Sequence, residues 1–582
     1  MPRIRGMMLA LCALAMLPAA AALTAADWDL KSDTWVATDA LGRTLPGYKE
    51  CRPTRAGKFV GIFYFLWLGQ HGTGGPHDIT KILAENSTNP KWGPEQTFHH
   101  WGEPELGYYV SDDDYVIRRH ARMLSEAGID TLIFDVTNGA TYLPVVTKLC
   151  ETYTRLRAAG EYTPQICFLA RSGSDKVVTA LYDEFYAKNR YPALWFRWKG
   201  KPLIFTGPCE LRPEIREFFT FRESWAWTNA DGWFGDGQDK WPWLDSYPQT
   251  PGWHEKGIAE EVAVCVAQHP TTNIGRSFHD GREPAPADQR PAEGLCFAEQ
   301  WKRALEIDPE FIFITGWNEW VAQRFLSSGN GEGLAGRTLA KGDTFFVDTY
   351  SQEYSRDIEP MKGGHTDNYY YQMIAGIRRF KGVRSPEHAS KPKTIGIDGK
   401  FDDWAGVAPE FRDVIGDTEP RNSTGWGSAG TYVNNTGRND LVRLKVARDS
   451  AYLYFYAETK AALTSADGRN WMLIFVDADC NSATGWNGYD YLINSPVIDS
   501  KATTLSKWAG NDGWKRAATL SYRASANKLE LRVPRAALGL AGKPVAIDFH
   551  CADNIVSIDD IIQFSLSGDS APDRRFNYRY RE

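Results

Sequence analysis

Acidic side chains stand beside tryptophan where apolar runs of the sequence end. Glu319 lies between Trp317 and Trp320 at the end of one such run. Asp135 lies at the end of another. Glycosidic bond cleavage uses paired carboxyl groups, because one protonates the leaving oxygen while the other assists the attack, and indole faces stack on sugar rings. These residues therefore favour acid and base catalysis on a carbohydrate, with Glu319 as the first candidate.

Glu319 needs a second carboxylate, and the segments after the other apolar runs supply candidates. In falling order of preference they are Asp135, Glu103, Glu105 and Glu353. Aromatic and polar residues of the same segments are predicted to contact the substrate, namely Tyr64, Trp67, His71, His100, Trp101, Tyr108, Asn138, Trp233, Trp317, Asn318 and Trp320.

Structural interpretations of the acidic residues stay open beside the catalytic one. Asp135 at a strand end is also suited to accept backbone hydrogen bonds as a buried structural carboxylate. Several acidic residues surround Arg356, and an ion-pair network that holds a loop would use the same residue types. They are Asp348, Glu353, Asp357 and Glu359.

The elements that must position these residues alternate between apolar runs and amphipathic segments. Eight runs are predicted as strands, at 59–67, 130–136, 164–170, 201–207, 219–227, 261–267, 311–317 and 344–350. Helical patterns lie between them, at 112–128, 176–188, 297–306 and 368–380. The repeated alternation predicts an α/β fold, a (β/α)8 TIM barrel over residues 27–384, in which the carboxyl ends of the strands carry the active site. A doubly wound open sheet is the alternative.

The chain changes character after residue 384. Residues 385–394 are polar and contain proline, which predicts a linker. Residues 395–582 contain short alternating strands separated by turns, which predict an all-β sandwich. One turn of this part carries hard oxygen ligands at a spacing suited to a structural Ca²⁺, namely Asp477, Asp479, Asn481 and Asp490. A turn rich in Asx residues without a metal is the alternative.

Composition and the N-terminus limit the partners and the location. The chain has 66 Lys and Arg against 73 Asp and Glu, a formal net charge of −7, so no basic surplus exists to bind nucleic acid.

Residues 1–26 combine two arginines, a short apolar run and small residues, the pattern of a cleaved secretory signal peptide. We therefore expect a secreted or periplasmic protein without stable membrane insertion. The sequence specifies no oligomeric state.

Tryptophan is concentrated in one segment of the chain. Six of the 22 tryptophans fall between residues 225 and 253, which predicts an aromatic wall of a substrate groove. A loop folded over its own aromatic cluster is the alternative.

The nine cysteines show no metal-ligand spacing, and an exported protein can hold one or two disulfides among them.

Several motifs of residues 58–382 occur in order at the predicted strand ends. They are HHWGEPELGYY, FDVTN, FITGWNEW and FVDTYSQEYSRDIEP. This part of the chain resembles the bacterial clan of family 71 and family 99-like glycoside hydrolases. The resemblance implies a (β/α)8 barrel that acts on an α-linked polysaccharide, and it implies that Glu319 acts as a base on a sugar hydroxyl. It implies no cofactor for catalysis.

One position departs from the family pattern. In that pattern a second catalytic Glu follows the first after three residues, whereas this chain has Ala322 there. The partner carboxylate must then come from elsewhere in the barrel. We expect a secreted glycoside hydrolase, endo-acting on an α-linked polysaccharide such as α-mannan or α-glucan. The alternative is a secreted glycan-binding protein with an inactive barrel, and a sugar transferase is disfavoured by export away from nucleotide-sugar donors.

The C-terminal part has its own resemblance. The segments IDGKFDDW, VRLKVARDSAYLYFYAET and VDADCNSATGWNGYDYLIN resemble family 9-like carbohydrate-binding modules. The resemblance implies a module that holds the enzyme near its polymer, with a polysaccharide or oligosaccharide as the partner. Candidate stacking residues of this part are Trp404, Trp426, Trp486 and Trp508.

Overall fold

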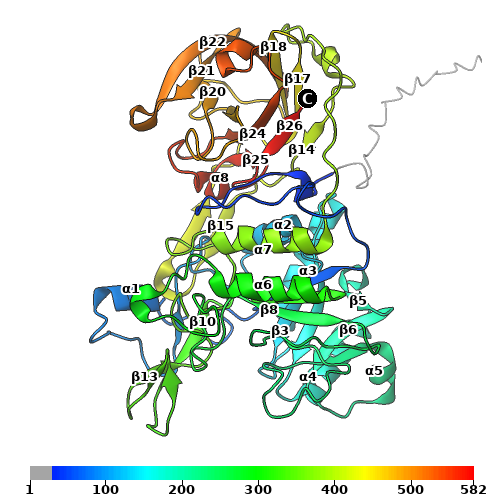
Figure 1. Ribbon diagram of the computed structural model, residues 1–582, viewed down its shortest axis with the longest axis vertical. Helices are drawn as coiled ribbons and strands as arrows, with labels where there is room; N and C mark the ends of the chain where they lie inside the picture. The colour runs from blue at the N-terminus through cyan, green and yellow to red at the C-terminus, as the bar shows by residue number, and fades with distance from the viewer. Residues whose placement is uncertain (1–28) are drawn as a thin grey trace, which may run out of the picture.

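The computed structural model describes residues 29–582, so the predicted signal peptide lies outside the described residues. An α/β part is followed along the chain by an antiparallel β part (Figure 1). Among residues 29–582, no helix has both the length and the apolar character required to cross a membrane. The eight cysteines of this range are all free thiols.

Seven parallel strands form the centre of the α/β part, in the order β7-β6-β4-β3-β1-β9-β8. Their bounds are β1 (Phe59–Tyr64), β3 (Thr131–Val136), β4 (Gln165–Ala170), β6 (Lys201–Thr206), β7 (Thr220–Glu223), β8 (Glu261–Cys265) and β9 (Phe311–Thr315). A short strand, β5 (Arg197–Trp198), pairs antiparallel with β6. These seven strands lie where the apolar runs predict them.

Helices accompany the parallel strands. Their bounds are α1 (Ile79–Glu85), α2 (Asp114–Ala127), α3 (Leu143–Ala158), α4 (Ser174–Leu181), α5 (Pro213–Phe218), α6 (Leu295–Ile307) and α7 (Asn368–Lys381). Helix α2 shows why the sequence predicts its ends. The Asp113 carboxylate accepts hydrogen bonds from the first-turn N–H groups of Tyr115 and Val116, and Gly128 ends the helix at a φ of 84°.

Side chains of the parallel strands alternate between two apolar layers. Phe63, Phe205 and Phe313 belong to an inner cluster, whereas Ile62 and Phe134 belong to a layer shared with the helices. The rings of Phe205 on β6 and Phe313 on β9 have centroids 5.7 Å apart, although β4, β3 and β1 separate those strands in the sheet. The sheet therefore curls round an interior as a barrel does, and the open-sheet alternative does not fit.

The predicted eighth barrel strand is wrong. Residues 344–346 form β13 (Thr344–Phe346), which pairs antiparallel with β10 (Val321–Leu326), and β10 also pairs with β2 (Phe98–His100). The run predicted at 344–350 supplies only three strand residues, and their partner is a loop strand rather than the barrel. The described barrel therefore has seven parallel strands.

The tryptophan-rich loop occupies the gap between β7 and β8. Parallel bridges join Glu223 to Lys240 and Ala226 to Leu244, so the loop continues the barrel wall. Trp241 is fully buried in the inner cluster, and its Nε1–H donates a hydrogen bond to Glu260 at 2.7 Å. Trp241 and Trp243 therefore help to close the barrel, whereas the other four tryptophans of the loop, Trp225, Trp227, Trp233 and Trp253, are partly exposed.

The C-terminal part is one continuous antiparallel sheet, in the order β14-β17-β18-β23-β22-β21-β20-β19-β24-β25, with β26 also paired to β24. The bounds are β14 (Glu410–Arg412), β17 (Leu441–Arg448), β18 (Tyr452–Thr459), β19 (Leu473–Asp477), β20 (Tyr491–Val497), β21 (Ala502–Trp508), β22 (Trp514–Ser525), β23 (Lys528–Pro534), β24 (Ala546–Asp553), β25 (Asp569–Ala571) and β26 (Tyr578–Arg581).

The two ends of this sheet approach each other. The Phe411 ring on β14 lies 5.1 Å from the Phe549 ring and 5.0 Å from the Tyr578 ring, between centroids. The predicted all-β character is confirmed, but the strands form one continuous sheet that folds back on itself, whereas the prediction was a sandwich. Helix α8 (Gln563–Leu566) precedes β25.

A hairpin of the C-terminal part packs against the α/β part. It consists of β15 (Arg421–Thr424) and β16 (Thr431–Asn434), and Figure 1 shows β15 between the antiparallel sheet and the helices. At its tip Trp426 is 1% exposed and contacts the rings of Phe98 and His100. Arg421 donates to Asp113, the residue that caps α2. Residues 385–394 contain no helix or strand.

Candidate active site

Glu319 follows β9 and is held on several sides. Its Oε2 lies 2.9 Å from Nη2 of Arg356, and its backbone N–H donates to Oδ1 of Asp357 at 2.8 Å. Its backbone oxygen accepts a hydrogen bond from Nε1–H of Trp101 at 3.1 Å. The Arg356 guanidinium lies over the Trp243 ring, 5.3 Å from its centroid. Glu319 is thus fixed in orientation and is 5% exposed.

The pKa of Glu319 is changed by burial and by the charges of its neighbours. Burial raises the pKa of Glu319 well above its usual value, whereas the positive charge of Arg356 lowers that pKa. The charges of Asp348, Asp357 and Asp135 raise it further. Asp135 is the penultimate residue of β3 and Glu319 follows β9, and both strands pair with β1. The structure therefore brings the first two predicted carboxylates to the same end of the sheet, where the charge of Asp135 raises the pKa of Glu319.

Asp135 is a well-supported carboxylate with 4% exposure. Its Oδ2 accepts a hydrogen bond from Nε1–H of Trp67 at 2.9 Å. Its Oδ1 accepts hydrogen bonds from the backbone N–H and the hydroxyl of Thr137, at 3.0 and 2.8 Å. Burial raises the pKa of Asp135, and these hydrogen bonds oppose the rise. The predicted structural role, a strand-end acceptor, and a role in chemistry are therefore compatible.

Aromatic and polar side chains gather beside Asp135. Trp67 is partly exposed, and its ring is nearly parallel to that of Tyr142, with 10° between planes and 6.1 Å between centroids. His71 Nε2 lies 2.7 Å from Oη of Tyr142, and the Asn138 amide also contacts that hydroxyl. The predicted residues Trp67, His71 and Asn138 thus lie together. Tyr142 was not predicted, although it follows Asn138 by only four residues.

Asp348 provides a more exposed carboxylate at the same site. Its Oδ1 lies 3.8 Å from Nη2 of Arg356 and 3.8 Å from Nε2 of His269, and half of its side chain is exposed. Burial lowers the pKa of His269 to about 4, so this imidazole is neutral at neutral pH. Of the acidic residues predicted to form an ion-pair network round Arg356, only Asp348 does so, and Glu319 is the other partner.

Asp357 positions Glu319 and is fully buried. Its Oδ1 accepts the Glu319 N–H, while Oδ2 has no hydrogen-bond partner among the described residues. Burial raises the pKa of Asp357 to about 6. A Cβ on Gly316 would lie only 3.0 Å from Asp357 Oδ1, so glycine suits this close approach. This positioning role was not predicted.

Three predicted carboxylates lie in other interactions. Glu103 pairs with Lys81 and Lys362 at 2.5 Å each. Glu105 forms a two-point ion pair with Arg574 of the C-terminal part. Glu353 accepts hydrogen bonds from the backbone N–H and the hydroxyl of Ser277, at 2.6 and 2.7 Å. Their partners already satisfy them, and the structure does not bring them to Glu319.

Several predicted substrate contacts are core residues. The rings of Trp101, Trp317 and Trp320 are completely buried, so they offer no face to a sugar in this conformation. Trp320 Nε1–H donates to Glu359, and Asn318 bonds the backbone of Phe65. The remaining predicted contacts that are buried away from solvent are Tyr64, His100 and Tyr108. Trp233 is partly exposed, and its Nε1–H donates to backbone oxygens of its own loop.

The predicted calcium ligands come together only in part. Asp477, Asp479 and Asp490 each offer an oxygen, and these oxygens lie within 4.8 Å of one another. Asn481 instead uses its side-chain oxygen to accept the Ala483 N–H at 3.2 Å. Burial and the charge of Asp548 raise the pKa of Asp477 to about 7. The three carboxylates fit Ca²⁺, and the Asx hydrogen bonds of the alternative interpretation are also present.

Comparison with known proteins gives structural neighbours only. No family model and no curated protein matches the sequence. Two solved structures of the GH99 endo-alpha-mannosidase from Bacteroides thetaiotaomicron are similar to this chain. The one in complex with bis-tris-propane is 16% identical, covering 55% of this chain and 97% of its own, with a TM-score of 0.32. The other is 17% identical, covering 56% and 99%, with a TM-score of 0.32.

Proposed function

We propose that the protein is a secreted or periplasmic glycoside hydrolase, endo-acting on an α-linked polysaccharide such as α-mannan or α-glucan. The observation that carries this proposal is the pair Glu319 and Asp135, two buried carboxyl groups on either side of β1 at the same end of the sheet, whose charges interact. The partly exposed Trp67 ring beside Asp135 supports a sugar partner. The motifs that resemble family 99-like hydrolases support an α-linked polysaccharide as the substrate.

Glu319 and Asp135 take different roles in this proposal. The ion pair with Arg356 favours the ionised form of Glu319 that a base requires, and it opposes the rise in pKa that burial causes. Glu319 accepts a proton from a sugar hydroxyl or a water molecule. Asp135, whose pKa burial also raises, donates a proton to the oxygen of the leaving sugar. Asp348 is the second choice for the donor because it faces Arg356 from the exposed side.

A glycan-binding protein without catalysis is the second candidate. Ala322, which stands where the family pattern has its second Glu, is 2% exposed on β10 and pairs with His99 of β2. No carboxylate therefore occupies that position, and Glu319 is already engaged in an ion pair with Arg356. Under this alternative the same Trp67 and Tyr142 rings bind sugar, but no bond is cleaved.

The C-terminal part is proposed to assist glycan binding and to hold Ca²⁺ at Asp477, Asp479 and Asp490. Its resemblance to family 9-like modules supports this role. Of the candidate stacking residues, Trp404, Trp426 and Trp486 are buried, and Trp426 packs on the α/β part. Trp508 on β21 is partly exposed and remains suited to stack on a sugar.

A polysaccharide screen tests the hydrolase proposal. The purified chain is incubated with α-mannan, α-glucan, and sulfated or algal polysaccharides, and new reducing ends are measured over time. We expect oligosaccharides to be released from one α-linked polymer and from none of the β-linked controls. Binding to such a polymer by calorimetry, with no new reducing ends, would instead favour the glycan-binding alternative.

The pH profile tests the role of Arg356. The Arg356 charge lowers the pKa of Glu319, so Arg356→Gln is expected to raise that pKa. Because a base must be deprotonated, the acidic limb of kcat/KM should move to higher pH by about one unit or more. Arg356→Lys keeps the charge and should move the limb less. Movement of the basic limb alone would show that Glu319 is the proton donor.

A further inference from the structure

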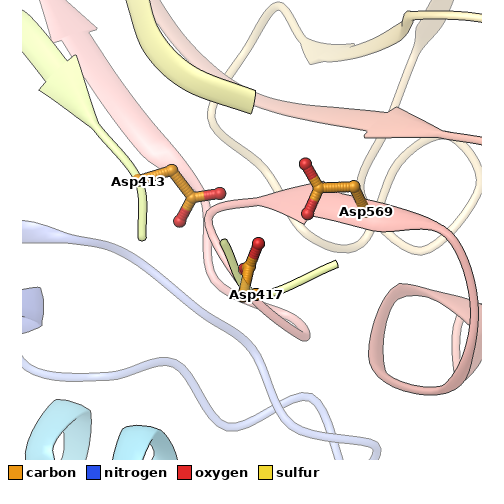
Figure 2. Close-up of side chains that lie close together, drawn as sticks. All are labelled: Asp413, Asp417 and Asp569. Carbon is orange, nitrogen blue, oxygen red and sulfur yellow. The ribbon is translucent and has the colours of Figure 1, made fainter. Parts of the chain in front are cut away.

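Buried charged groups of this protein differ in whether a proton can neutralise them. Asp413, Asp417 and Asp569 of the C-terminal part are buried close together (Figure 2). Burial and the charge of Asp573 raise the pKa of Asp417 to about 8, so a proton removes this charge at neutral pH. A guanidinium group cannot release its proton in the same way. Arg171, at the candidate active site, is therefore the more informative charged group.

Arg171 directly follows β4, at the end of the barrel where the candidate active site lies. Strand β4 pairs in parallel with β3, the strand that carries Asp135. The backbone N–H of Ser172 donates to the carbonyl of Thr137 at 2.8 Å. The loop that carries Arg171 therefore lies beside the loop that follows Asp135.

Aromatic rings connect Arg171 to the other side of the site. Its guanidinium lies over the Trp225 ring, 4.4 Å from the centroid. The rings of Trp225 and Trp243 have centroids 6.5 Å apart, and the guanidinium of Arg356 lies over the Trp243 ring. Arg356 is the ion-pair partner of Glu319. Side-chain contacts therefore lead from Arg171 to Glu319 across the same end of the barrel.

The Arg171 guanidinium is held in place but has no anionic partner. Among residues 29–582, its side chain forms no ion pair and donates no hydrogen bond, and its buried Nη1 is without a partner. A Cβ on Gly207, which follows β6, would lie 3.2 Å from this Nη1. The N–H donors of a guanidinium lie in its plane, and the Trp225 ring covers only a face of that plane. The stack therefore fixes the orientation of Arg171 and leaves its in-plane donors unused.

Arg197 provides a comparison within the same chain. Its guanidinium also lies over an indole, that of Trp195, at 5.7 Å from the centroid, but Arg197 is exposed, so water satisfies its donors. Arg171 is only partly exposed, and its Nη1 is shielded from water. Burying a charged donor without an acceptor is costly, and an anion bound at Arg171 would offset that cost.

We propose that Arg171 binds an anionic group, a carboxylate or a sulfate ester, on a sugar of the substrate, so that the α-linked polysaccharide is a charged one. This inference rests on the proposed function, because it names the class of sugar that the same site binds. Carboxylate and sulfate both offer paired oxygens, which match the fork of in-plane guanidinium donors. The formal net charge of −7 gives the chain no general attraction for polyanions, so recognition depends on a local cation.

Binding of chemically matched polymers by the full-length chain tests the role of Arg171. α-Mannan and α-glucan are each used in a neutral form, a partly sulfated form and a form partly oxidised to the uronate. Affinity is measured by isothermal titration calorimetry, and new reducing ends are measured in parallel. We expect one charged form to bind about 10- to 100-fold more tightly than its neutral parent, because hydrogen bonds to a charged group contribute about this factor. The sulfated and oxidised arms identify which anionic group is bound.

Three variants assign this preference to Arg171. Arg171→Met keeps an unbranched side chain against the Trp225 ring but removes the charge, so the charged polymer should bind only as well as the neutral one. Arg171→Lys keeps the charge without the fork of donors and should retain part of the preference. Arg197→Met is the matched control, because it removes a stacked cation at the opposite end of β6. It should leave the preference unchanged, and thermal unfolding checks that each variant is folded.

Several results would overturn the role of Arg171. They are equal affinity of the unmutated chain for neutral and charged forms, no binding to any form, a preference that Arg171→Met retains, and an equal loss in Arg171→Met and Arg197→Met. The hydrolase proposal is judged separately by reducing ends. Cleavage of a neutral polymer without preference for a charged one would support hydrolysis and reject the role of Arg171. A charged polymer that is bound through Arg171 but not cleaved would support this role and the glycan-binding alternative.

Discussion

Glu319→Gln is expected to lower kcat/KM on the responsive polysaccharide by about 10² to 10⁴-fold. Glutamine keeps the size of the side chain and can still bond Arg356, but it cannot accept a proton. The unfolding midpoint should therefore change little, because the backbone hydrogen bond to Asp357 and the contact with Trp101 remain. Reducing-end assays and thermal unfolding of the same preparation measure both quantities.

A matched control for this prediction is Glu103→Gln. Glu103 is also a carboxylate of the α/β part, but it pairs with Lys81 and Lys362 and not with the site. Its substitution should leave kcat/KM within about twofold, since partly exposed ion pairs contribute little. Full activity of Glu319→Gln would remove Glu319 from catalysis. Equal losses in both variants would indicate a general effect on the fold.

Arg574→Ala is expected to destabilise the protein by about 3 to 5 kcal/mol. Arg574 and Glu105 are 2 and 5% exposed, and they join the two parts of the chain through bonds of 2.8 and 2.7 Å. Removing the guanidinium leaves the Glu105 carboxylate buried without its cation. Urea unfolding of the full-length chain, followed by tryptophan fluorescence, measures the change.

The double variant Arg574→Met with Glu105→Gln is the control for that experiment. It removes both charges and keeps most of the packing volume, so it should recover most of the lost stability. A loss below about 1 kcal/mol for Arg574→Ala would contradict a buried interface between the two parts. It would instead favour a C-terminal module that is tethered loosely.

Much of the secondary structure could be predicted from local pattern. Seven of the eight predicted barrel strands form because each apolar run is long enough to bury both faces between the interior and the helices. The run at 344–350 looked similar, but only three of its residues form a strand, and β10 supplies their partner. Whether such a run joins the barrel depends on which distant segment it pairs with, and the local sequence pattern does not specify that partner.

The aromatic loop and the C-terminal sheet show the same limit. The density of tryptophan predicts that residues 225–253 are unusual, but composition does not distinguish an open groove from a barrel wall. Trp241 is buried because β7 and β8 do not pair directly and the gap between them must be filled. Alternating runs likewise predict antiparallel strands, whereas the closure of one sheet depends on contacts such as that of Phe411 with Tyr578.

For the candidate site, the sequence alone predicted Glu319 and Asp135, because each is a charged residue at or just after the end of an apolar run, and parallel strands bring such ends together. Trp67, His71 and Asn138 followed from the same rule. Only the tertiary structure decided that Arg356 is the partner of Glu319, that Glu105 pairs with Arg574 of the C-terminal part, and that Trp317 and Trp320 are buried in the core. Burial and partner choice depend on side chains from the whole chain, and neighbours in sequence do not determine them.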